Sequence, residues 1–185
     1  MPPSIFDHLD EMRAFADRGD WDGLETRFAQ LATDLAGAKP VRRIAGVDLS
    51  TYQQQLAEGL HKAVRQTEAR EVPAVYFEYD LDNGWSGTFF LCETYNALSE
   101  GDDDWACDFS EHIAGPDLPV FSELYKEAGG FDRTPLQVAT TTLLVARTVA
   151  AFGRASADVT AEAVNICIAF HDQDPILRIR EHGQP

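Results

Sequence analysis

The sequence predicts an α+β fold in which N-terminal helices precede an antiparallel sheet of about five strands, with one long buried helix packed on it. Three observations lead to this prediction. Residues 72–95 alternate apolar and polar side chains around an Asp-Asn-Gly turn, which is the pattern of a β-hairpin. Residues 1–71 repeat apolar positions at helical spacing. Residues 134–153 are apolar around most of a helix circumference, as expected inside a core.

The N-terminal 71 residues are predicted to be mainly helical. Apolar residues recur every three or four positions over residues 4–19 and again over residues 20–37, with Gly19 and Gly37 as stops. Residues 38–49 fit either a loop or a short edge strand. A further helix begins at Ser50, and Pro73 prevents it from continuing much beyond Glu71.

The hairpin is the clearest local signal in the chain. Residues 75–81 form its first strand and residues 88–94 its second, and Asp82, Asn83 and Gly84 supply the turn between them. The returning strand is apolar on both faces, so we expect another part of the chain to cover the second face of the sheet.

The remaining elements follow in order. Residues 104–109 alternate in a way that predicts a strand with one wet, acidic face. A short helix covers about 120–128, and Thr134 and Pro135 open the long helix that ends at Gly153. Residues 164–170 and 176–180 read as two strands. The polar turn between them also resembles a ligand cluster, but residues of this kind before a proline are typical of turns. We expect one domain over residues 1–185, with the sheet and its covering helix in 72–185.

Composition favours a soluble globular protein, because 44% of the residues are hydrophobic and 25% are charged. No apolar run approaches the roughly 20 residues that cross a bilayer, so no membrane role is expected. The first residues show neither a basic leader nor an apolar signal core, and we therefore expect a cytoplasmic protein. Three cysteines cannot all pair within one chain and are interpreted as reduced, with Cys92 and Cys167 in the core and no nucleophilic role for Cys107.

The net charge of −16 is concentrated in the middle third of the chain. Residues 71–132 hold 15 Asp and Glu against 1 Lys, whereas residues 1–70 hold 11 acidic and 9 basic residues and residues 133–185 hold 5 of each. Such a field repels nucleic acid and anionic lipid and attracts cations or a basic protein. The acidic middle third is therefore the stretch expected to carry function.

The first functional hypothesis is a non-enzymatic binding protein that engages a basic protein partner through this acidic stretch. A bacterial immunity-type inhibitor would fit, since blocking a basic nuclease calls for a phosphate-like field. A solvated acidic loop that only prevents strand association explains the same residues without any binding. The residues expected to bind are acidic or aromatic: Asp82, Trp85, Asp102, Asp103, Asp104, Trp105, Asp108 and Glu111.

Two other hypotheses remain open. One is a hydrolase or metal-dependent enzyme that uses the carboxylates from Asp102 to Asp108 with His112 or His171. The other is a scaffold or oligomeric subunit, and the sequence does not indicate an oligomeric state. The nucleotide-binding, zinc-protease and serine-hydrolase motifs are absent, and consecutive aspartates do not have EF-hand spacing. The sequence therefore favours no catalytic residue, no metal site and no cofactor.

Overall fold

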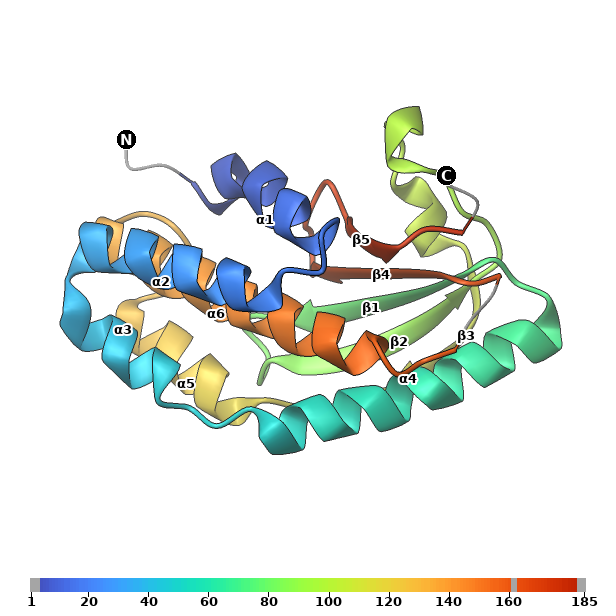
Figure 1. Cartoon of the computed structure of the whole chain (residues 1–185), viewed down its shortest axis with the longest axis horizontal. Coiled ribbons are helices and arrows are strands. Elements are labelled where there is room, and N and C mark those ends of the chain that lie inside the picture. Colours follow the sequence, from blue (N-terminus) through green and yellow to red (C-terminus); the bar gives the residue numbers. More distant parts are fainter. Residues whose placement is uncertain (1–3, 161–162, 183–185) are drawn as a thin grey trace.

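A computed structural model of the chain describes residues 4–160 and 163–182, and it shows an α+β fold (Figure 1). The helical elements are the 3-10 helix η1 (Ile5–His8), α1 (Leu9–Ala16), α2 (Trp21–Ala36), α3 (Ala38–Ala45), α4 (Ser50–Arg70), the short 3-10 helices η2 (Leu98–Glu100) and η3 (Asp104–Cys107), α5 (Pro119–Ala128) and α6 (Pro135–Ser156). The strands are β1 (Ala74–Asp80), β2 (Ser86–Cys92), β3 (Phe109–Ala114), β4 (Asn165–Phe170) and β5 (Leu177–Arg180).

Within these residues the strands form one five-stranded sheet in the order β3-β2-β1-β4-β5. The predicted hairpin is confirmed: β1 and β2 are antiparallel, with Ala74 opposite Cys92 and Asp80 opposite Ser86. The Asp80 carboxylate stabilises the turn, since Oδ1 accepts the backbone N–H groups of Asp82 at 2.9 Å and Asn83 at 3.1 Å. The antiparallel prediction is right for three of the four pairings, and the central pair β1–β4 is parallel.

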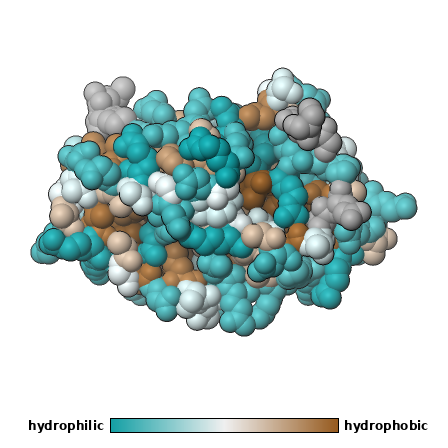
Figure 2. Space-filling view, viewed as in Figure 1, coloured by the Kyte–Doolittle hydropathy of each residue, from teal (hydrophilic) through white to brown (hydrophobic). Residues whose placement is uncertain are grey.

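The long helix α6 is the core of the helical layer, as predicted. The Thr134 hydroxyl caps its first turn by accepting the Gln137 N–H at 3.3 Å. On the sheet side, the Phe152 ring stacks on Phe77 of β1 with centroids 5.2 Å apart. α6 is long and apolar enough to cross a membrane, but 89% of its most apolar window is buried inside the protein, as in the core helix of a soluble fold. Figure 2 shows the outside of the helical layer as mostly hydrophilic, with hydrophobic residues in small patches.

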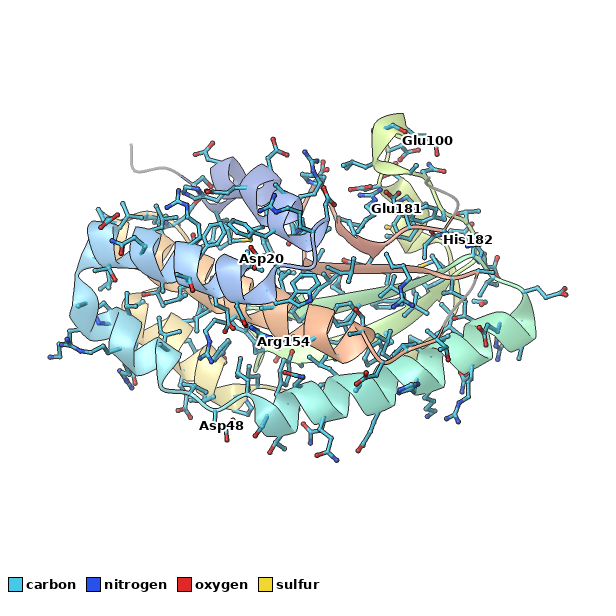
Figure 3. The ribbon with its side chains drawn as sticks, viewed as in Figure 1. Asp20, Asp48, Glu100, Arg154, Glu181 and His182 are labelled. Atoms are coloured by element: carbon cyan, nitrogen blue, oxygen red, sulfur yellow. The ribbon has the colours of Figure 1, made fainter. Side chains whose placement is uncertain are left out.

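The second face of the sheet has its own small apolar cluster. Tyr76 of β1 and Cys167 of β4 project to this side, and Trp105 of η3 covers them. The covering element is the segment of residues 93–108, which leaves the sheet after β2 and returns at β3; Figure 3 labels Glu100 at its tip and Glu181 below it, just after β5. The expectation that something covers the second face of the hairpin is therefore confirmed.

Two predicted elements are wrong in type. Residues 38–45 form the helix α3 instead of a loop or edge strand, because Val41 and Ile44 lie one helical turn apart and both pack into the main core. Residues 104–107 form the 3-10 helix η3 instead of a strand, and β3 begins only at Phe109. Trp105 and Ala106 are both buried there, and Trp105 packs on the second face of the sheet.

Candidate functional site

The largest hollow among the described residues lies on the second face of the sheet, and we call it the acidic groove. It has a volume of about 740 Å³ and opens between the segment 93–108 and the turn after β4. Aromatic side chains line its sheet side. The carboxylates in its lining come from three parts of the chain: Glu78, Asp102, Asp103, Asp104, Asp172 and Asp174.

The aromatic floor follows from the period of two along the strands. Tyr76 of β1 and Phe90 of β2 are directly opposite in the antiparallel register, and their rings stack with centroids 5.9 Å apart. Phe109 at the start of β3 lies against Phe90 at 4.7 Å, and its own side chain is 42% exposed. The groove thus has an apolar base in which the flat side of a ligand or a side-chain stem can lie.

A buried ion pair fixes the segment that forms one wall of the groove. Arg178 of β5 is 4% exposed at its side chain and donates to Asp103 Oδ1 at 2.5 Å and to the carbonyl of Asn96 at 3.0 Å. The other Asp103 oxygen accepts the N–H of Ile176 at 2.7 Å. The Arg178 guanidinium also lies 5.7 Å from the centre of the Trp105 ring. These contacts attach residues 96–105 to the end strand of the sheet.

A polar network around His171 joins the aromatic floor of the groove at Tyr76. His171 Nδ1 lies 3.2 Å from Glu78 Oε1, and Nε2 lies 3.7 Å from an Asp172 oxygen. The hydrogen bond with Glu78 raises the pKa of His171, and the negative charge of that carboxylate raises it further. The Tyr76 hydroxyl donates to Glu78 Oε2 at 3.0 Å. Burial raises the pKa of Tyr76, so the phenol remains a neutral donor.

The structure brings three of the predicted binding residues together and separates the others. Asp102, Asp103 and Asp104 line the groove, although Asp103 is occupied by Arg178. Asp82 lies at the hairpin turn and lines a neighbouring hollow. Asp108 is exposed between η3 and β3.

Glu111 faces a different neighbour, because it forms an ion pair with Arg70 at the end of α4. Arginines neutralise three of the fifteen carboxylates of residues 71–132 in this way, in the pairs Asp103–Arg178, Glu111–Arg70 and Glu127–Arg43.

The two predicted aromatic contacts do not reach the surface. Trp85 is fully buried, and its indole N–H donates to the Thr148 hydroxyl of α6 at 3.0 Å. Its backbone has a φ of +54°, which turns the side chain from the hairpin loop into the core. Trp105 is 4% exposed and covers Tyr76. Neither ring can contact a partner directly, so the expectation of tryptophan anchors is corrected: Trp85 is a core residue and Trp105 supports the groove wall from behind.

Sequence reasoning missed several residues of the groove. In the sequence, Glu78 falls on the polar side of the alternating pattern of the hairpin, and the residues around Asp172 and Asp174 predict a turn. That interpretation is confirmed in part, because the Gln173 side chain stabilises the turn by accepting the Phe170 N–H at 3.2 Å and donating to the Pro175 carbonyl at 2.8 Å. The two aspartates remain exposed and face the groove. In the sequence, the only indication that these two aspartates are available to a ligand is that no Lys or Arg lies near them until Arg178.

The hydrolase or metal-dependent enzyme hypothesis joins Asp102 to Asp108 with His112 or His171, and of these two histidines His171 lines the groove with Asp102, Asp103 and Asp104. In the part of the chain that the structure describes, no three His, Cys, Asp or Glu side chains gather as a metal site would need. Cys92 and Cys167 are buried free thiols, and burial raises the pKa of Cys92 to about 12. His112 is exposed on β3, away from the His171 network, although its ring lies 6.2 Å from Phe90.

Comparison with known proteins gives no assignment. No protein family matches the chain, and no curated protein or solved structure is similar to it at a significant level.

Proposed function

We propose that this protein is a non-enzymatic binding protein that engages a basic segment of a protein partner in the acidic groove. The observation that carries the proposal is the composition of the groove, whose six carboxylates face an aromatic floor. No Lys or Arg is among its lining residues, and the basic side chain there is His171. A site of this kind complements lysine or arginine side chains, whose alkyl stems lie on apolar surface while their heads meet carboxylates.

The charges that remain available support this choice of partner. Asp102, Asp104 and Asp174 are exposed on the rim, and no Lys or Arg ion pair to them occurs in residues 4–160 and 163–182. Uncompensated carboxylates around one hollow attract cations and speed their association. The same field repels phosphate groups, so a nucleic acid would bind poorly.

The shape of the groove supports a peptide-like ligand. Its volume of about 740 Å³ falls in the range of pockets that bind ligands the size of a few side chains, and its lining comes from three separate parts of the chain. The wall is fixed by the Asp103–Arg178 pair, so a ligand meets a preformed surface. A cytoplasmic inhibitor of the immunity type, which masks the basic surface of a nuclease, is the form of this function that we favour.

Binding of a defined cationic probe tests the proposal. Fluorescence anisotropy of a labelled peptide of alternating lysine and serine is measured at about 50 mM and about 500 mM salt, between which the Debye length falls severalfold. We expect saturable binding that weakens with salt. The variant D102N/D104N/D174N should weaken binding by about 3-fold to about 100-fold, because each exposed charge contributes about 0.2–1 kcal/mol.

A matched variant separates the groove from the overall charge. D34N/E68Q/D158N removes three exposed carboxylates outside the groove and changes the net charge by the same amount. It should bind the peptide nearly as well as the unmodified protein. Equal loss in both variants, or no saturable binding at low salt, would contradict a site in the groove.

A further inference from the structure

A second hollow adjoins the acidic groove, and we call it the aromatic pocket. It has a volume of about 230 Å³ and shares only His171 and Asp172 with the groove. It lies where β1 and β4 end, beneath η1 and beside α5. Two classes of side chain make its wall: the rings of Phe6, Tyr125, Phe131 and Phe170, and the carboxylates of Asp80, Asp82 and Asp172.

The three phenylalanine rings form a compact cluster around this hollow. Phe6 lies 5.8 Å from Phe131 and 6.1 Å from Phe170, and Phe131 lies 5.9 Å from Phe170, measured between ring centres. The rings come from η1, from the loop before α6 and from β4, so the fold gathers them from three distant parts of the chain. Phe6 remains 43% exposed although it is packed on two other rings. A ligand that covered it would remove apolar surface from water.

The carboxylates give the same pocket a negative potential. Asp80 uses Oδ1 for the two N–H groups of the hairpin turn, and no hydrogen bond to its Oδ2 occurs among the described residues. Burial raises the pKa of the Tyr125 hydroxyl, and the nearby carboxylates raise it further, to about 12. Asp82 acts through its charge and a hydrogen bond, and Asp132 and Asp80 act through their charges. No Lys or Arg lines this pocket, and the basic side chain in its wall is again His171.

Aromatic faces combined with carboxylates are the chemistry that recognises an organic cation. Ring faces attract a cation within about 6 Å of the centroid, and an alkylammonium ion also has apolar groups to lie against them. A simple metal ion would leave the rings unused, and a neutral apolar ligand would desolvate the carboxylates without compensation. We propose that the aromatic pocket binds a compact alkylammonium group, either in a free small molecule or on a methylated lysine side chain.

This inference does not depend on the proposed function, since a ligand can occupy this pocket whether or not the groove binds a peptide. The two hollows meet only at His171 and Asp172. The test below therefore uses Phe6 and Asp82, which line the aromatic pocket and not the groove.

Titration of the full chain with choline, followed by NMR of the aromatic side chains, tests the proposal. We expect shifts at Phe6, Phe131 and Phe170 that saturate. The neutral isostere 3,3-dimethylbutanol, which has the same shape without the charge, should bind at least 10-fold more weakly. F6L and D82N should each weaken choline binding by about 3-fold or more, because each removes one of the two attractions. A short peptide with one trimethyllysine distinguishes the two sources of the alkylammonium group. Tighter binding than choline indicates a methylated lysine of a protein, and weaker binding than choline indicates a free small molecule.

L136A is the control, because Leu136 is 42% exposed, against 43% for Phe6, but lies on α6 and lines neither the aromatic pocket nor the acidic groove. It should leave choline binding unchanged, and thermal melts establish that each variant is folded. The proposal is overturned if choline and the isostere bind equally, if L136A weakens binding as much as F6L, or if neither choline nor the trimethyllysine peptide shifts the three rings.

Discussion

Replacement of Arg178 by methionine should destabilise the protein more than any other single loss of an ion pair described above. The methionine keeps the apolar stem but leaves Asp103 without its cation and the carbonyls of Ile176 and Asn96 without a donor. Arg178 and Asp103 are only 4% and 16% exposed at their side chains, so water cannot replace the lost contacts freely. Breaking a buried pair from one side costs about 3–5 kcal/mol, which in a domain of this size lowers Tm by about 6–20 °C.

Thermal and urea denaturation measure this effect, and hydrogen exchange at residues 96–107 locates it. A double-mutant cycle with D103L and D103L/R178M should give a coupling of about 1–3 kcal/mol, since the double variant leaves no unpaired charge. The control is R43M, which breaks the exposed pair with Glu127 and should change Tm little. The reasoning is refuted if R178M melts within about 2 °C of the unmodified protein, or if R43M is equally destabilised.

The pH dependence of the same pair has a defined sign. Burial raises the pKa of Asp103, but the hydrogen bonds from Arg178 and from the Ile176 N–H outweigh it, so the pKa is lower in the folded protein. The pair therefore contributes stability at pH values above the unfolded pKa of about 3.9 and loses it as the pH falls through the folded pKa. R178M should lose less stability than the unmodified protein as the pH falls through this range, because Asp103 no longer has the cation that lowers its folded pKa.

Three further predictions concern separate parts of the molecule. G59A should lower the free energy of unfolding by about 1 kcal/mol in urea denaturation, because an added Cβ would lie 2.5 Å from the buried Phe89 ring. The cost of this overpacking exceeds the gain in helix propensity from alanine. A G59A variant that is more stable than the unmodified protein would contradict the close packing of α4 on β2. The pKa of His171 should lie above 6.5 when it is measured by NMR, and it should return toward that value in E78Q. The stability that protonated His171 contributes should be complete below the unfolded pKa and should disappear as the pH rises through the folded pKa. Cys107 should react at once with a thiol reagent while the two buried cysteines react only on unfolding, and three fast thiols would show that the sheet core is open.

Much of the fold could be predicted because its signals are local. The hairpin depends on an alternation and a turn within some twenty residues, and α6 depends on Thr134, Pro135 and a continuous apolar stretch. The parallel pairing of β1 with β4 has no such signal, since Ala74 and Asn165 are opposite each other but far apart in sequence. Alternation marks a strand but does not give its neighbour or its direction.

The candidate site was predictable only in the part that lies in one stretch of sequence. Asp102 and Asp104 stood out because no basic residue is near them in the chain. The sheet order alone brings Asp172 and Asp174 to the same groove and Arg178 to Asp103. The loop position of Trp85 suggested exposure, and its positive φ, which reverses that expectation, is a property of the folded backbone.

The position of β1 affects how the molecule is made. β1 lies in the middle of the sheet, and one of its two neighbours begins only at Asn165. On the ribosome, the chain up to residue 160 emerges with one long edge of β1 unsatisfied, and such an edge can recruit a strand from another nascent chain. Synthesis must pass Phe170, the end of β4, before β4 can pair with β1. Slow translation of the residues up to Phe170 should therefore increase aggregation during expression.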